Sequence, residues 1–189
     1  MNKRTIMYKK LLVIAFMAII PTLVHANNLK MDTTLPAVTV TNKGELILNN
    51  NSITYQPWSS AKLVGKTHII MAIAGRTSAK EINAQLVNAI STAKFPQQKY
   101  QTTTIINQDD AIWGTSSFVK SAAEESKKQY PWSSIVLDSN GNVQKSWDLQ
   151  KESSAIIVLD KNAKILFIHE GALNQQQLQQ VIALVKKNI

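Results

Sequence analysis

The stretch HIIMAIAGRTS, residues His68–Ser78, decides the fold of this chain. Its first part, His68–Ile73, is an unbroken apolar run introduced by Gly65-Lys66. Such a run predicts a strand that is covered on both faces, as in a parallel or mixed sheet. The run passes directly into the short polar segment Ala74–Ser78 and then into residues with helical spacing. The stretch therefore predicts a buried strand whose carboxyl end leads into a helix.

A helix and a second strand are expected next along the chain. Ser78 and Glu81 match the spacing of a capping box at a helix start. Pro96 marks the exit from the helix, and Tyr100–Asn107 is rich in threonine and isoleucine, which favours a strand. A strand, helix and strand of this length predict a right-handed parallel crossover. The apolar stripe of the helix is expected at Ile82, Leu86, Val87 and Ile90.

The remaining segments complete one α/β domain. The pattern predicts short strands at Ala37–Thr41 and Glu45–Leu48, a helix from about Ser116 to Gln129, strands at Ser134–Leu137 and Asn142–Trp147, a hairpin of Ala155–Leu159 with Lys164–Ile168, and a closing helix with a capping box at Asn174 and Gln177. The opening segment, Asn27–Pro36, is polar and is expected to be loose. This order predicts a sandwich in which helices flank a mixed central sheet, formed by residues 27–189.

Residues 1–26 have the pattern of a secretory signal peptide. Basic residues precede an apolar core, Leu11–Ile20, and Val24-His25-Ala26 fits a cleavage site, so cleavage is expected after Ala26. Removing the segment lowers the formal charge from +9 to +5, and the remaining lysines are scattered. Without a basic stripe, a nucleic-acid partner is not expected. No later segment approaches the roughly 20 apolar residues that span a membrane.

The chain contains no cysteine. Export normally places a protein where disulfides are permitted, yet this one can form neither a disulfide, nor a thiolate nucleophile, nor a thiolate metal site. A lipid anchor on cysteine is excluded for the same reason. The histidines have no ligand spacing to one another, and no nucleophile elbow or Gly-rich phosphate loop is present. No metal, cofactor or catalytic residue is therefore expected.

Several ungapped segments of the mature chain resemble the YtfJ family of periplasmic proteins from Gram-negative bacteria. These segments are Leu63–Lys66, Ile73–Lys80, Tyr100–Ile105, Asp109–Ile112, Tyr130–Trp132, Val136–Gly141 and Glu152–Ala155. The resemblance covers essentially the whole mature chain. It implies a thioredoxin-like fold and export to the periplasm, and it implies no agreed activity.

The chain also resembles, more loosely, the thioredoxin and TlpA-like superfamily, and this resemblance bears on redox chemistry at cysteine. There, the loop after the first central strand carries Cys-x-x-Cys at a helix N-terminus, which lowers the thiol pKa. Arg76 and Ala79 take the two cysteine places here, and Ser154 stands where the superfamily has a cis-proline. Thiol–disulfide exchange and thiol peroxidase activity are therefore excluded by composition.

One face is the expected site. Ligands in open α/β sheets tend to lie beyond the carboxyl ends of parallel strands, and the strands at His68–Ile73 and Tyr100–Asn107 deliver their following loops to one edge. The Ser153-Ser154 turn should join them. The candidate residues are Arg76, Thr77, Ser78, Asp109, Asp110, Trp113 and Ser154.

Each candidate has a structural alternative. Arg76 and the free amides of the following helix could hold an anion, or Arg76 could pair with Asp109 or Asp110 while Ser78 only caps the helix. The two aspartates could act as an acid/base pair or bind a cation, or they could simply cap or solvate a turn. Trp113 lies in a polar, glycine-flanked loop, where an exposed tryptophan would suit a protein contact.

The leading hypothesis is an exported, non-catalytic binding or adaptor protein that uses this face for a periplasmic protein partner. The competing class is a cysteine-independent enzyme or a receptor for a small anionic ligand, using Arg76 with Asp109 or Asp110. A concave pocket at the face would favour the receptor, whereas a flat apolar patch rimmed by charge would favour the adaptor.

Overall fold

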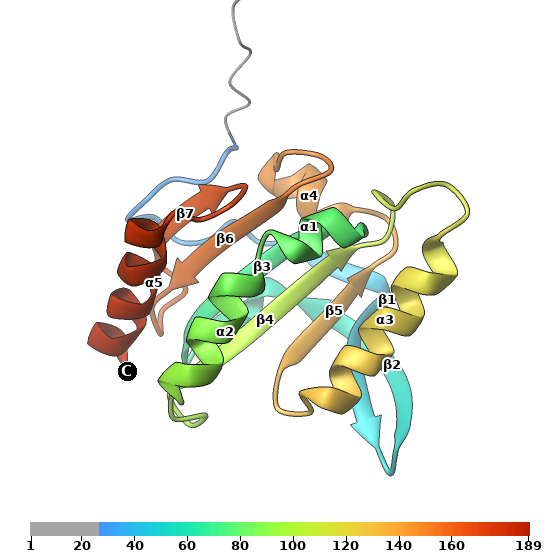
Figure 1. Cartoon of the computed structure of the whole chain (residues 1–189), viewed down its shortest axis with the longest axis horizontal. Helices are drawn as coiled ribbons and strands as arrows, with labels where there is room; N and C mark the ends of the chain where they lie inside the picture. Colours follow the sequence, from blue (N-terminus) through green and yellow to red (C-terminus); the bar gives the residue numbers. More distant parts are fainter. Residues whose placement is uncertain (1–26) are drawn as a thin grey trace, which may run out of the picture.

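The computed structural model describes residues 27–189, so the expected signal peptide lies outside the described residues. A seven-stranded mixed sheet runs through the molecule in the order β2-β1-β5-β4-β3-β6-β7 (Figure 1). Its strands are β1 (Thr39–Asn49), β2 (Ser52–Ser59), β3 (Thr67–Ala74), β4 (Tyr100–Asn107), β5 (Ser134–Asp138), β6 (Ser154–Leu159) and β7 (Ile165–Glu170). The helices are η1 (Ser60–Leu63), α1 (Thr77–Glu81), α2 (Ala84–Ala93), α3 (Ser116–Gln129), α4 (Asn142–Trp147) and α5 (Gln175–Asn188).

The centre of the sheet is parallel, and its edges are antiparallel. β4 pairs in parallel with β3 and with β5, as the crossover predicts. β6 joins β3 in antiparallel register, with His68 opposite Leu159 and Ile73 opposite Ser154. All eight residues of β3 are buried, which confirms that this strand is covered on both faces. The predicted α/β sandwich is therefore confirmed.

Two apolar cores lie on opposite faces of the sheet. α1, α2, α3 and α5 lie in front of the sheet in Figure 1, and the core on this side includes Ile69, Leu86 and Val181. The other core includes Ile70 and Trp147 and packs under α4 and the opening segment. Since alternate residues of β3 enter different cores, the central strand holds both layers together.

The opening segment 27–36 is packed, which corrects the expectation that it is loose. Leu29 and Leu35 are buried in the core on the α4 side. Backbone amides of the segment also bond to distant strands: Asp32 N–H donates to Ile165 O at 2.9 Å, and Leu35 N–H donates to Ala163 O at 2.9 Å. Two buried leucines and these backbone hydrogen bonds together anchor the segment.

The segment Asn142–Trp147 is a helix, α4, and the prediction of a strand was wrong. Its two buried residues, Val143 and Trp147, are four apart, which places them on one helical face. Asp138, at the end of β5, accepts a hydrogen bond from Val143 N–H at 2.8 Å through its carboxylate. A side chain before the turn thus satisfies an amide at the helix start, a signal that hydrophobic alternation does not contain.

The region expected to hold two short strands, Ala37–Thr41 and Glu45–Leu48, forms the single strand β1. Its pairing with β2 shifts register between Val40 and Glu45. Gly44 lies in this irregularity with φ +83°, and a Cβ there would stand 2.2 Å from Gln56 O. The expected turn is therefore a bulge within one strand, and β2 was missed altogether.

The helix expected after β3 is divided into α1 and α2, and the predicted capping box at its start is absent. Arg76 is the N-cap of α1 and makes no side-chain cap, so Ser78 lies inside the first turn. Leu86 is buried, while Val87 and Ile90 pack partly against the same core. The capping box of α5 at Asn174 and Gln177 is confirmed by two hydrogen bonds of 2.9 Å. Within residues 27–189, no helix combines the length and apolarity needed to cross a bilayer.

Candidate functional site

The site begins where β3 and β4 end, at the upper right of the sheet in Figure 1. Gly75 N–H donates to Asn107 O at 2.8 Å, which ties the loop after β3 to the end of β4. A Cβ on Gly75 would lie 2.8 Å from that carbonyl oxygen and 3.3 Å from Ala111 Cβ. Only glycine fits such a close approach without displacing backbone, so Gly75 fixes the spacing of the two loops.

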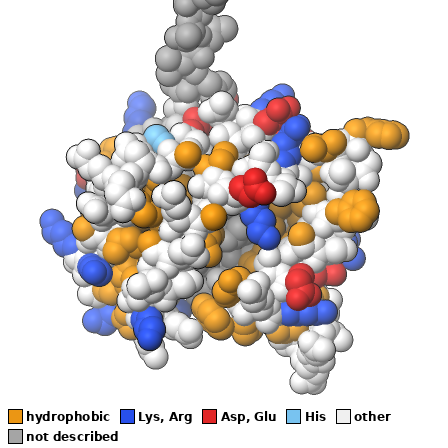
Figure 2. Space-filling model, in the orientation of Figure 1, with side chains coloured by type: hydrophobic (Ala, Val, Ile, Leu, Met, Phe, Trp, Pro, Cys, Tyr) orange, Lys and Arg blue, Asp and Glu red, His pale blue; other side chains and the backbone are white. Residues whose placement is uncertain are grey.

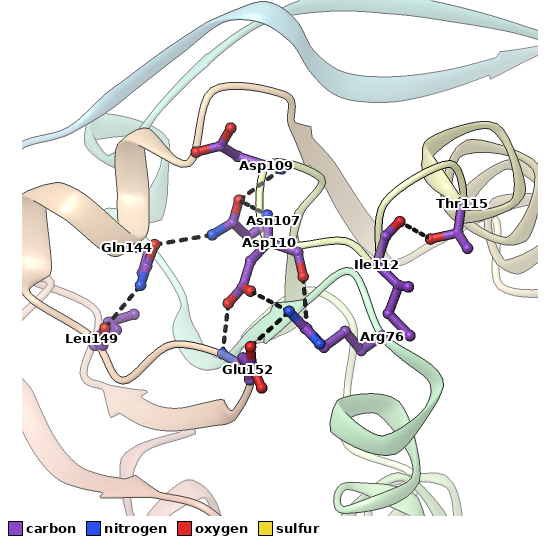
Figure 3. Close-up of polar contacts among 9 residues, drawn as sticks. All are labelled: Arg76, Asn107, Asp109, Asp110, Ile112, Thr115, Gln144, Leu149 and Glu152. Carbon is purple, nitrogen blue, oxygen red and sulfur yellow. Dashed lines mark hydrogen bonds and ion pairs between the residues drawn. The ribbon is translucent and has the colours of Figure 1, made fainter.

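Arg76 joins three loops through its guanidinium (Figure 3). Its Nε donates to Asp110 O at 3.0 Å, and its Nη2 donates to Asp110 Oδ1 at 3.2 Å and to Glu152 Oε1 at 2.9 Å. Asp110 Oδ2 also accepts from Glu152 N–H at 2.6 Å. The pairing of Arg76 with Asp110 is the structural alternative that the sequence allowed. Glu152 is an addition that sequence reasoning missed.

Glu152 has a left-handed backbone conformation, with φ +58°. A non-glycine residue seldom adopts such an angle, and surrounding contacts must hold it. Here Asp110 accepts from its amide, Arg76 contacts its carboxylate, and the neighbouring Ser153 O accepts from Ala74 N–H at 2.9 Å. The loop before β6 is therefore held onto the ends of β3 and β4.

Asn107 organises the loop after β4. Its Oδ1 accepts from Asp109 N–H at 3.0 Å and from Asp110 N–H at 3.3 Å (Figure 3). Its Nδ2 donates to Gln144 Oε1 at 3.3 Å, which connects the loop to α4. This buried amide turns the backbone so that Asp110 faces Arg76, and it is a second residue that sequence reasoning missed.

Asp109 points to a different partner from Asp110. Its Oδ2 lies 3.0 Å from Lys145 Nζ, and both side chains are about half exposed. The two aspartates therefore do not form a carboxylate pair. No group of three or more metal-ligating side chains occurs among residues 27–189.

Three further candidates lie at unequal depths. Thr77 and Ser78 are exposed at the start of α1. Ser154 is only 2% exposed and accepts a hydrogen bond from Asn83 Nδ2 at 2.7 Å, beneath the surface. Its place in a contact patch is corrected accordingly: Ser154 supports the face from below and cannot touch a partner directly.

Trp113 is the most exposed large apolar side chain among the described residues, at 96%. Ile112 and Phe118, at 55% and 73%, belong to the same segment. Hydrophobic side chains protrude over this segment, between β4 and α3, at the upper right of Figure 2. Thr115 Oγ1 donates to Ile112 O at 2.6 Å, which orders the turn between them. We call Ile112 and Trp113, in the loop before α3, together with Phe118, in the first turn of α3, the apolar loop.

The face beside Arg76 has little hollow space. A cavity of about 20 Å³ lies between this loop system and α4, with Asp110, Gln144 and Ser153 in its wall. That volume is on the scale of one water molecule. The face is therefore an ion-paired surface next to a protruding apolar loop.

Comparison with known proteins agrees with this fold. The family model described as "Bacterial protein of unknown function (YtfJ_HI0045)" matches residues 29–188. The chain is 46% identical to "Uncharacterized protein YtfJ" of Escherichia coli (strain K12), over 89% of this chain and 92% of that one. It is 44% identical to an uncharacterized protein of Haemophilus influenzae, over 95% and 97% of the two chains.

Among solved structures, the thioredoxin domain of a thiol-disulfide oxidoreductase from Bacteroides vulgatus superposes with a TM-score of 0.57. That match covers 85% of this chain and 99% of the other at 17% identity, which shows a thioredoxin-like fold and nothing of the activity. The family model and the two relatives each cover most of the chain, and the chain therefore belongs to the YtfJ_HI0045 family of bacterial proteins.

Proposed function

We propose that this protein is an exported, non-catalytic adaptor that binds another protein in the periplasm. The binding face is the apolar loop and the adjoining cluster of Arg76, Asp110 and Glu152, which we call the Arg76 network. The observation that carries the proposal is the exposure of Ile112 and Trp113, in the loop before α3, and of Phe118, in the first turn of α3, beside paired charges. Apolar residues at the centre and charges at the rim are the usual arrangement of a protein interface.

Tryptophan at this position supports a protein partner rather than a chance surface residue. A fully solvated indole forgoes the burial that stabilises most tryptophans, and exposed apolar clusters commonly mark interaction sites. Trp58 and Trp147 of the same chain are buried, with only 2% and 0% of their surface exposed. Trp113 is therefore an exposed residue of the type that contributes most to the binding free energy of protein interfaces.

The competing functions, an anion receptor or a cysteine-independent enzyme, have less support. Two carboxylates, from Asp110 and Glu152, surround the single guanidinium of Arg76. An incoming anion would have to displace one of them, and the nearby cavity has room for about one water. Asp109, paired with Lys145, does not face Arg76 and is badly placed to act as a base beside it.

The test is photo-crosslinking in living cells with a photoreactive phenylalanine at position 113. The aromatic probe replaces an aromatic side chain that lies in solvent, so the fold should tolerate it. The control carries the same probe at Gln179, an exposed position of α5. We expect a discrete protein adduct from position 113 alone, and that adduct should disappear when Ile112 and Phe118 are both replaced by serine.

Two results would refute the adaptor. One is the absence of any adduct from position 113, and the other is an identical set of adducts from positions 113 and 179. The recovered protein also tests export: its first residue should be Asn27, and it should lie in the periplasmic fraction. A chain that retains Met1 in the cytoplasm would contradict that part of the proposal.

A further inference from the structure

A pocket of about 360 Å³ lies at the opposite end of the sheet, where β3, β4 and β5 begin. This volume falls within the range of small-molecule sites. Its wall includes the side chains of Glu45, Lys62, Lys66, His68 and Lys127 and two tryptophans, Trp58 and Trp132. The wall therefore combines polar side chains from the strand starts with two tryptophans.

The charges in the wall do not cancel. Glu45 accepts from Lys62 Nζ at 2.8 Å and from Ser134 Oγ at 2.7 Å, so both of its oxygens are engaged. Burial raises the pKa of Glu45, but these hydrogen bonds outweigh the burial and lower it overall, so the carboxylate is ionised at neutral pH. Lys62 and Glu45 thus balance one another.

Lys66 and Lys127 are the charges left over; Lys66 Nζ donates to Gln97 O at 2.8 Å, and Lys127 is the more buried of the two. Lys127 is only 7% exposed, and its Nζ donates to Pro131 O at 2.9 Å and to Ser133 O at 2.6 Å. No carboxylate of residues 27–189 forms an ion pair with it. Its hydrogen-bond acceptors are two neutral carbonyls, and Glu45, which acts on its charge from the same wall, is already bonded to Lys62 and Ser134. Burial lowers the pKa of Lys127 and the charge of Glu45 only partly offsets this, so an anion that reached the ammonium through the pocket would be stabilised there.

His68 provides a second polar group. The ring is 4% exposed, and Nδ1 lies 3.1 Å from Thr103 Oγ1. Nε2 has no hydrogen-bond partner within residues 27–189, yet that part of the chain has no fully buried side-chain nitrogen or oxygen without a partner. Nε2 must therefore reach open space, and the pocket is the space that the ring lines. Burial, and then the charge of Lys66, lower the pKa of His68 to about 4, so the ring is neutral at pH 7.

The two tryptophans give the pocket flat apolar walls. Trp58 is only 2% exposed and belongs to the core on the α4 side of the sheet, whereas Trp132 is 56% exposed. Gln101 Nε2 donates to the backbone carbonyl of Trp132 at 2.7 Å, and the indole meets the Tyr130 ring edge to face. An exposed indole is suited to stacking against a planar ligand.

We propose that this pocket binds a small organic monocarboxylate with a planar apolar body. The carboxylate accepts from Lys127 Nζ and from His68 Nε2, in the tautomer in which the Thr103 hydroxyl donates to Nδ1. The planar body lies against the tryptophans. Inorganic phosphate fits less well, because it has no apolar body to place against the tryptophans. This site is separate from the apolar loop and does not depend on the adaptor function.

The probe is benzoate, with benzamide as its neutral counterpart and inorganic phosphate as the dianion. Amide NMR shifts of the isotope-labelled protein, followed up to about 10 mM probe, report both affinity and location. We expect benzoate to shift His68, Thr103 and Lys127 and to bind at least about tenfold more tightly than benzamide or phosphate, a tenfold ratio corresponding to about 1.4 kcal/mol.

The matched variants are Lys127→Met and Lys128→Met, which remove the same charge from neighbouring positions of α3. Lys128 is exposed and does not line the pocket. Lys127→Met should weaken benzoate binding at least about tenfold, whereas Lys128→Met should change it less than about twofold. If Lys127→Met fails to fold, the wild-type comparison of benzoate with benzamide still decides.

The proposal is overturned if benzoate does not bind by about 10 mM, a weak limit for a pocket of this size. It is also overturned if benzoate and benzamide bind equally, or if the shifts map to the apolar loop instead of the strand starts. Tighter binding of phosphate than of benzoate would assign the pocket to a different class of anion and would equally contradict it.

Discussion

Where β3, β4 and β5 end, side chains from three loops close over the sheet; where the same strands begin, a pocket stays open. At the first end, Arg76 is matched by two carboxylates, and the apolar loop stands out beside it. At the second, the hydrogen bonds of Lys127 go to backbone carbonyls, and a pocket of about 360 Å³ opens beside it. The outward-facing end is suited to a protein, and the hollow end is suited to a small molecule.

This difference shows that a fold does not fix which end of a sheet is used. Open α/β sheets usually bind ligands beyond the carboxyl ends of their strands. Here the ion pairs of Arg76 fill that place, and the larger hollow lies at the amino ends. Function must be argued from the side chains at each end and not from the architecture.

The largest expected effect concerns pH and the hollow end. In the unfolded chain, His68 has a pKa of about 6.5, and burial, followed by the charge of Lys66, lowers the pKa to about 4 in the folded protein. Between these values, unfolding takes up a proton, so acidification favours the unfolded state. The stabilisation is complete above about pH 6.5 and is lost progressively as the pH falls to about 4. The loss is about 3 kcal/mol.

Urea denaturation at several pH values between about 7 and 4 measures this slope. His68→Gln should flatten it, while the same substitution at His169, at the end of β7, should leave it in place. Equal slopes in wild type and His68→Gln would show that His68 is not buried in the neutral form. The difference between the two ends of the sheet would then be smaller than described.

The next effect concerns the closed end. Gly75→Ala should destabilise the protein by about 2 kcal/mol, because the added methyl group would stand 2.8 Å from Asn107 O and force the two loops apart. Ser78→Ala is the control on the same turn. Its side chain makes no cap, so it should change the free energy of unfolding by less than about 0.5 kcal/mol. A tolerated Gly75→Ala would mean that the loops at this end are not closely packed.

The smallest effect compares two ion pairs at the closed end. Arg76→Met leaves the mostly buried Asp110 without its cation and should cost about 1 kcal/mol. Lys145→Met removes an exposed partner of Asp109 and should cost less than about 0.5 kcal/mol. Thermal unfolding of both variants checks the order. If Lys145→Met proved the more harmful, Asp109 and not Asp110 would be the structural centre of the face.

Local signals in the sequence predicted elements well where the deciding contacts are themselves local. The capping box of Asn174 and Gln177 joins residues three apart, and it formed as expected. The helical α4 depends instead on Asp138 and on burial of Trp147 against the opening segment, where its Nε1 donates to Pro36 O at 3.0 Å. Alternating hydrophobicity over Asn142–Trp147 could not reveal either contact.

The candidate site was predictable to the extent that strand order brings loops together. Neighbouring ends of β3 and β4 left Arg76 either to hold an anion or to pair with Asp109 or Asp110, and it pairs with Asp110. Glu152 could not be chosen in advance, because its part depends on a left-handed backbone conformation imposed by tertiary contacts. Ser154 was expected on the face but lies under it, since its hydroxyl is held by Asn83 from the turn between α1 and α2.

The Arg76 network also bears on how fast the molecule opens. Its contacts join residues 34, 42 and 76 positions apart in the chain, so they can form only after the central sheet has brought three loops together. Interactions made after the rate-limiting step of folding hardly change the folding rate, but they slow unfolding. We therefore expect that losing this network shortens the lifetime of the native state and leaves the rate of folding nearly unchanged.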